Sequence, residues 1–197
     1  MNLPNKLTIF RIILIPIMIL VWLFPFAQFN IDLGALTFGF VTLPVKNIII
    51  LIIFAVASFT DFLDGYIARK NSLITTFGKF MDPIADKLLV NTTLLLLLSS
   101  GAIPFVPVFI MIARDTIVDG MRMVASSNGV VVAAGFLGKM KTVCQMIAII
   151  LLLLNNLPFE LYNIPLSNIM LWFASFISAV SGISYYLKLK DYILESI

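Results

Sequence analysis

Four aspartates lie close together in a strongly apolar sequence: Asp61, Asp64, Asp82 and Asp86. An ionised carboxylate in or near hydrocarbon costs several kcal/mol unless it is paired, hydrated or bound to a metal ion. Carboxylate oxygens are preferred ligands of hard cations such as Mg²⁺ and Mn²⁺. Two such cations about 4 Å apart can clamp the attacking and leaving oxygens in phosphoryl chemistry. We therefore expect the four aspartates to bind divalent cations.

The spacing of the aspartates places them beside very small residues. On a helix, one stripe contains Asp61, Asp64, Gly65 and Ala68, and a second contains Gly78, Asp82 and Asp86. Small residues allow a ligand or another helix to approach the backbone, and the adjacent Arg69 offers donors that match phosphate. Pro83 is expected in the first turn of the second helix. The alternative is purely structural, with the acids paired to Arg69, Lys79, Lys87 or Arg114.

The residue inventory narrows the possible chemistry. The chain has no His and one Cys, so neither imidazole catalysis nor an intramolecular disulfide is available. Catalysis must depend on carboxylates, amines, guanidinium groups, phenols and hydroxyls. Cys144 lies in an apolar run and is expected to be an inert packing residue.

The composition is that of an integral membrane protein. The 197 residues are 61% hydrophobic, and the mean hydropathy of +1.09 is far above that of a soluble domain. We expect an all-α fold of six transmembrane helices in one domain, residues 1–197, because apolar stretches occur at 9–29, 48–59, 88–98, 103–113, 143–154 and 164–187. The middle stretches are too short to span a bilayer alone, so each must continue into polar sequence.

Charge distribution predicts the orientation. Alternating six spans place nearly every Lys and Arg on the side of both termini, with Lys46 alone opposite, so this side is expected to be cytosolic. The polar helix ends then form a cytosol-facing active-site cavity. Residues 1–7 are expected to enter the membrane as an interfacial segment. The first apolar stretch is expected to be a retained helix, because it lacks a small-residue cleavage site. The form of residues 30–46 and 126–138 is left open.

The aspartate segment TDFLDGYIARKNSLITTFGKFMDPIADK matches the complete signature of the CDP-alcohol phosphatidyltransferase family, which this chain therefore resembles. The resemblance implies six helices with cytosolic termini, two divalent cations (Mg²⁺ or Mn²⁺), and transfer of a substituted phosphate from a CDP-linked donor to an alcohol with release of CMP. It also implies that Asp61, Asp64 and Asp82 bind metal, and that Asp86 lies near metal and takes the proton of the attacking hydroxyl. Gly65, Ala68 and Gly78 would accommodate cytidine, and Arg69 would contact a donor phosphate.

Three further segments are similar to the branch of this family that makes phosphatidylglycerophosphate. LPNKLTIFR contains Asn5, Thr8 and Arg11, which the resemblance assigns to binding CDP-diacylglycerol; ARDTIVDGMR contains Arg114, Asp115 and Arg122; GKMKTVCQ contains Lys139 and Lys141. Asp115 stands where Glu is expected in many such enzymes. The resemblance implies a lipid bilayer location in the bacterial cytoplasmic membrane, a homodimer, and no nucleic-acid partner.

Four cations suit a phosphorylated acceptor. Arg114, Arg122, Lys139 and Lys141 exceed what a neutral alcohol needs, whereas sn-glycerol 3-phosphate brings about two negative charges that require cationic donors. Alternatively, Arg122 pairs with Asp119 and both lysines only mark the cytosolic side. Other acceptors used by related enzymes are serine, inositol phosphate, phosphatidylglycerol and choline. A cation-coupled transporter is a remote alternative, because the chain has no internal repeat and no external polar half-helices.

Overall fold

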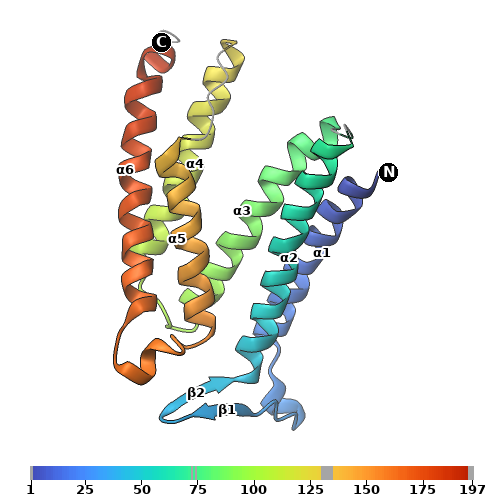
Figure 1. The fold of residues 1–197 in the computed structure, drawn as a ribbon, viewed down its shortest axis with the longest axis vertical. Coiled ribbons are helices and arrows are strands. Elements are labelled where there is room, and N and C mark those ends of the chain that lie inside the picture. Colours follow the sequence, from blue (N-terminus) through green and yellow to red (C-terminus); the bar gives the residue numbers. More distant parts are fainter. Residues whose placement is uncertain (1, 72, 74, 130–134, 195–197) are drawn as a thin grey trace. The chain divides into compact units, whose positions relative to one another are not determined.

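The computed structural model describes residues 2–71, 73, 75–129 and 135–194, which fall into two compact units. Unit 1 comprises Met1–Ser99 and Leu153–Ile164, and unit 2 comprises Ser100–Leu152 and Pro165–Ile197. The helices are α1 (Leu3–Leu23), α2 (Val45–Lys70), α3 (Thr76–Ser99), α4 (Phe105–Ser127), α5 (Phe136–Leu153) and α6 (Leu166–Leu194), with short 3-10 turns at Phe26–Phe29 and Phe159–Tyr162 (Figure 1). The six helices make up most of the chain, which confirms the predicted all-α class of membrane fold.

Within the residues that the structure describes, four helices are long and apolar enough to cross a membrane by length and composition: α1, α2, α5 and the Leu166–Lys190 part of α6. Both α3 and α4 join an apolar half to a half that carries the predicted functional charges, including Asp82 and Asp86 on α3 and Arg114 and Arg122 on α4. The number of six spans and the single domain stay predictions.

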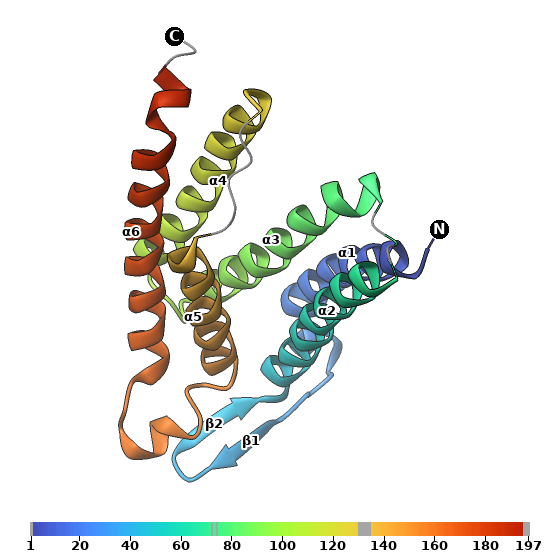
Figure 2. The same cartoon turned by 45° about the horizontal axis from the view of Figure 1, so that its top comes forward.

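In unit 1, α1 packs against α2 and α3 (Figure 2). The buried stripe of α1 is polar near its start and apolar further on: Asn5, Thr8, Arg11, Ile15, Met18 and Trp22. The helix begins at Leu3 because the side chain of Asn2 accepts the backbone N–H of Asn5 as an N-cap. One face of α1 therefore supplies apolar residues to the core of unit 1 and, near the start of the helix, buried polar residues.

The segment 30–46, whose form the sequence left open, contains a β-hairpin. Strands β1 (Ala35–Phe38) and β2 (Val41–Pro44) pair antiparallel with Phe38 opposite Val41. The turn needs Gly39, whose φ is +61°. Asn155 donates to the carbonyl of Thr42 at 2.7 Å, which ties the hairpin to the second segment of unit 1.

The structure corrects one local expectation. Thr75 Oγ1 accepts the backbone N–H of Gly78 at 3.0 Å, and α3 begins directly afterwards at Thr76. Pro83 therefore lies well inside α3, and its predicted place in the first helical turn is wrong. The form of segment 126–138 was also left open by the sequence. In the structure, α4 ends at Ser127 and α5 begins at Phe136, and residues 130–134 lie outside the described residues.

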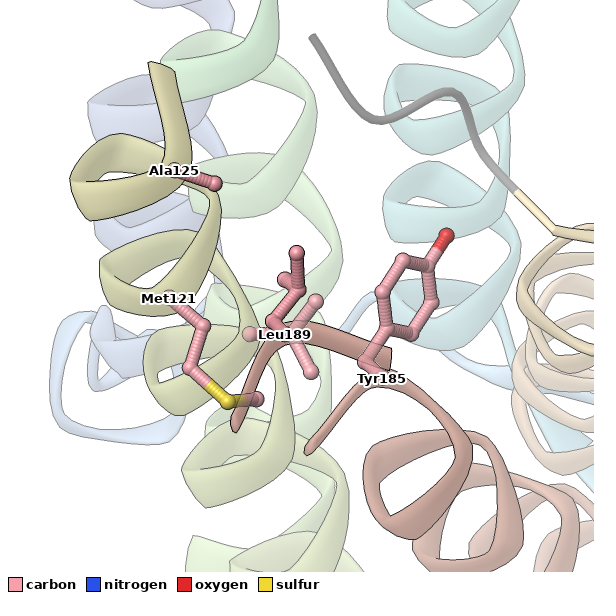
Figure 3. Close-up of a cluster of buried hydrophobic side chains, with 5 residues drawn as sticks. Met121, Ala125, Tyr185 and Leu189 are labelled. Carbon is pink, nitrogen blue, oxygen red and sulfur yellow. The ribbon is translucent and has the colours of Figure 1, made fainter. Parts of the chain in front are cut away.

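In unit 2, α4 and α6 pack together through a small cluster of buried side chains (Figure 3). Met121 and Ala125 come from α4, and Tyr185 and Leu189 come from α6; Val118 completes the cluster. The hydroxyl oxygen of Tyr185 points away from Met121 and Ala125. The ring of Tyr185 thus belongs to the apolar cluster, while its polar atom lies outside it.

Candidate active site

The first two aspartates surround a buried arginine. Arg11 is fully buried, and its Nη2 donates to Asp64 Oδ2 at 2.5 Å. Its Nη1 lies 2.7 Å from Asp61 Oδ1 but makes no hydrogen bond to it, so this contact is an ion pair held by Coulombic attraction. The side chain of Asp64 is 3% exposed and that of Asp61 is 42% exposed. One guanidinium thus bridges both carboxylates of the α2 stripe.

The α3 acids lie beside this pair. Thr8 donates to Asp82 Oδ1 at 2.7 Å, and both Asp61 and Asp82 are close enough to act electrostatically on Asp64. Asp86 is half-buried and lies one turn beyond Asp82 on α3. Within the described part of the chain, no three carboxylates are close enough to form a metal site as their side chains stand. The donor set is nevertheless all oxygen, which fits Mg²⁺ or Mn²⁺.

A cavity of about 180 Å³ opens at the same end of unit 1. Six of the residues that the sequence assigned to donor or metal binding line it, namely Asn5, Gly65, Ala68, Arg69, Gly78 and Asp82; the others are Pro4, Leu73 and Thr75. These residues come from α1, α2, α3 and the connection between α2 and α3. The start of α1 and the continuous segment from the end of α2 to the first turns of α3 therefore border one space.

Polar contacts hold the walls of this cavity together. Thr75 Oγ1 donates to Asn5 Oδ1 at 2.8 Å and accepts from the N–H of Gly78, which joins α1 to the start of α3. A Cβ on Gly78 would lie 3.3 Å from Thr75 Oγ1 and 3.5 Å from both Asn5 Oδ1 and Asp82 Oδ2. Glycine at position 78 therefore keeps open the space between the polar groups.

The predicted acceptor residues lie in unit 2. Asp115, which is 7% exposed, accepts from Arg114 Nη1 at 2.9 Å and from Lys141 Nζ at 2.5 Å. Lys141 is itself buried, whereas Lys139 is exposed on α5. A single carboxylate therefore joins α4 to α5 and fixes two of the four predicted cations.

Arg122 is held from α6. Its Nη2 donates to the hydroxyl of Tyr185 at 2.8 Å, and Arg114 Nη2 donates to Ser181 Oγ at 2.6 Å. Arg114 and Arg122 both lie on α4, so their contacts with α6 are part of the α4–α6 packing.

The predicted donor-binding residues, together with Asp82, fall into two groups: those that line the cavity and those that pair with aspartates. Asn5, Gly65, Ala68, Arg69, Gly78 and Asp82 share the unit 1 cavity, whereas Arg11 pairs with carboxylates and Thr8 with Asp82. Sequence reasoning missed Thr75 and Tyr185. A Thr three residues before Gly78 is a helix-start signal that could have identified Thr75. No local pattern marks Tyr185, because its partner Arg122 is 63 residues away.

Comparison with known proteins identifies the family of this chain. The sequence profile described as CDP-alcohol phosphatidyltransferase matches residues 1–180. A Bacillus subtilis protein named CDP-diacylglycerol–glycerol-3-phosphate 3-phosphatidyltransferase is 48% identical over 187 residues, which are 95% of this chain and 94% of that protein. A Rickettsia bellii protein of the same name is 37% identical over 192 residues, 97% of each chain. The predicted family is confirmed: this chain belongs to the CDP-alcohol phosphatidyltransferases.

Proposed function

We propose that this protein transfers the phosphatidyl group of CDP-diacylglycerol to sn-glycerol 3-phosphate, giving phosphatidylglycerophosphate and CMP. The observation that carries the proposal is the unit 1 cavity, where Gly65, Ala68, Arg69, Gly78 and Asp82 of the family signature meet Asn5. Relatives that are 37% and 48% identical over nearly their whole length carry the name of this enzyme. The family, the substrate pair and the cavity therefore support the same reaction.

The carboxylates are suited to divalent cations. Asp61, Asp64, Asp82 and Asp86 would hold Mg²⁺ or Mn²⁺, because the group offers only oxygen ligands and already accommodates the positive charge of Arg11. When bound, such cations polarise phosphate oxygens and neutralise charge that develops during transfer.

Other residues of this chain bind the donor and accept the proton of the acceptor hydroxyl. Gly65, Ala68 and Gly78 leave room for the cytidine of the donor, and Arg69 binds its phosphate. Asp86 takes the proton from the attacking hydroxyl of the acceptor. The oxygen of that hydroxyl forms a bond to the phosphorus that carries diacylglycerol, the bond from this phosphorus to CMP breaks, and CMP leaves with the bonding electrons.

The acceptor phosphate is assigned to Arg114, Arg122, Lys139 and Lys141 in unit 2. Charge-assisted donors of this kind suit a phosphate ester better than they suit serine or free glycerol. The proposal places six membrane-spanning helices in the bacterial cytoplasmic membrane, with both termini and the active site on the cytosolic face, and includes a homodimer. The one-sided distribution of Lys and Arg supports this orientation.

The test is an acceptor panel with purified protein in detergent. CDP-diacylglycerol and Mg²⁺ or Mn²⁺ are combined with sn-glycerol 3-phosphate, glycerol, serine, inositol phosphate or phosphatidylglycerol, and CMP release and lipid products are measured. We expect turnover only with glycerol 3-phosphate and its abolition by a chelator. Asp82→Asn should also abolish turnover, whereas Asp32→Asn, at an exposed aspartate outside the site, should not. Preferential use of another alcohol would overturn the proposed acceptor, and chelator-resistant activity would overturn the metal site.

A further inference from the structure

Tyr185 is a residue of α6 that contacts both Arg114 and Arg122 of unit 2. Its side chain is 5% exposed and packs with Val118, Met121 and Leu189, yet its hydroxyl lies outside this apolar cluster (Figure 3). The hydroxyl accepts from Arg122 Nη2 at 2.8 Å and from the backbone N–H of Gly135 at 2.8 Å. The tyrosine therefore connects α4, α6 and the residue immediately before α5.

The ring of Tyr185 also contacts both arginines. Its centroid lies 5.4 Å from Cζ of Arg114 and 4.9 Å from Cζ of Arg122, within the range in which a guanidinium is attracted to an aromatic ring. Two guanidinium groups beside one ring repel each other; Asp115, which accepts from Arg114 Nη1 at 2.9 Å, offsets part of this repulsion, and a bound dianion would offset more. One aromatic ring of α6 thus contacts both guanidinium groups of α4.

Two further residues of α6 determine the position of the Arg114 side chain. Ser181, one turn before Tyr185, accepts from Arg114 Nη2 at 2.6 Å. A Cβ on Gly182 would lie 3.1 Å from Arg114 Cγ, so only glycine leaves full space for the arginine stem. The path of Arg114 is therefore determined by α6 as well as by its own helix.

A cavity of about 190 Å³ lies against this arrangement. Its lining includes Gly138, Ser181, Tyr185 and the exposed Lys188. A Cβ on Gly138 would lie 3.7 Å from both Arg114 Nη2 and Tyr185 Oη, so the guanidinium group of Arg114 lies close to one of the residues that line this cavity. Phe136 and Leu137 form an apolar part of the lining, while the hydroxyls of Ser181 and Tyr185 and the amine of Lys188 offer polar groups that suit a phosphate ester.

We propose that Tyr185 is a positioning residue that orients Arg114 and Arg122 for the phosphate of the acceptor, and thereby favours a phosphorylated alcohol over a neutral one. The inference rests on the proposed function, because the phosphate concerned is that of sn-glycerol 3-phosphate. Tyr185 acts through the arginines, so its removal should weaken acceptor binding and leave donor binding unchanged.

The experiment compares Tyr185→Phe and Tyr185→Leu with Tyr186→Phe, a control at the adjacent residue, which is 50% exposed. Phe keeps the ring but loses the hydroxyl that accepts from Arg122, and Leu loses both. We expect Tyr185→Phe to raise KM for glycerol 3-phosphate about tenfold, the low end for a hydrogen bond to a charged group. Tyr185→Leu should raise it further, and the control should match wild type.

Two readouts separate positioning from a merely structural role. In an Arg122→Gln background, Tyr185→Phe should change KM for the acceptor by less than about twofold, because residues that act through one contact are not additive. Inorganic phosphate should inhibit wild type competitively against glycerol 3-phosphate, and Tyr185→Phe should weaken this inhibition. KM for CDP-diacylglycerol should stay at the wild-type value in Tyr185→Phe.

Each contrary result has a distinct meaning. If wild type does not use glycerol 3-phosphate, the proposed function fails whatever Tyr185 does. If Arg122→Gln raises KM for the acceptor and Tyr185→Phe does not, the positioning role alone is overturned. Equal increases in KM for donor and acceptor, or full additivity with Arg122→Gln, would also overturn it.

Discussion

Replacing Arg11 with Gln should destabilise unit 1 mainly through Asp64. The side chain of Asp64 is 3% exposed, and without the guanidinium its carboxylate would be buried and unpaired, which costs about 3–5 kcal/mol. The side chain of Asp61 is 42% exposed, so loss of its ion pair should add no more than about 1 kcal/mol. Arg11→Gln should therefore lower the free energy of unfolding by about 3–5 kcal/mol.

Double-mutant cycles can assign this loss to one carboxylate. Unfolding in mixed detergent micelles can be followed by tryptophan fluorescence, since Trp22 lies on the same buried stripe of α1 as Arg11. Adding Asp64→Asn to Arg11→Gln should recover about 2–3 kcal/mol, because the buried charge is removed. Adding Asp61→Asn should recover little. Mg²⁺ should raise the unfolding midpoint of Arg11→Gln more than that of wild type, because the carboxylates no longer have a protein cation.

Two results would refute this reasoning. Equal stability of wild type and Arg11→Gln would show that the buried ion pair contributes no net stability. Equal rescue by Asp61→Asn and Asp64→Asn would show that burial does not decide which carboxylate depends on Arg11. Arg11→Lys provides a further control, since it keeps the charge but cannot span both carboxylates with a planar fork; its stability should lie between wild type and Arg11→Gln.

Three further substitutions test other parts of the site. Asp86→Asn should lower kcat by at least about 10² while CDP-diacylglycerol still binds, as expected for loss of a general base; loss of donor binding would instead indicate a metal ligand. Gly78→Ala should raise KM for CDP-diacylglycerol and not for glycerol 3-phosphate, because its Cβ would narrow the unit 1 cavity; Gly120→Ala, where a Cβ meets nothing within 4 Å, should have no effect on either. Gly182→Ala should show the opposite pattern, with KM raised for glycerol 3-phosphate alone, because the new Cβ would lie 3.1 Å from Arg114 Cγ.

Much of the candidate site follows from local sequence. Helical periodicity alone puts Asp61, Asp64, Gly65 and Ala68 on one stripe, because residues three, four and seven positions apart share a helix face. The same argument places Asp82 one turn after Gly78. Apolar composition is equally local, and it indicates a helical membrane protein without reference to any tertiary contact. The form of 30–46 was not predictable in this way, since the hairpin is tied to Asn155 from a distant segment.

The partners of these residues were decided only by the tertiary structure. The sequence offered Arg69, Lys79, Lys87 and Arg114 as counter-ions for the aspartates, yet Asp61 and Asp64 pair with Arg11, because the packing of α1 against α2 buries Arg11 beside them. Tyr185 likewise meets Arg122 across 63 residues. Such contacts depend on how helices pack and which faces they bury, and side-chain periodicity within one helix carries no information about the neighbouring helix.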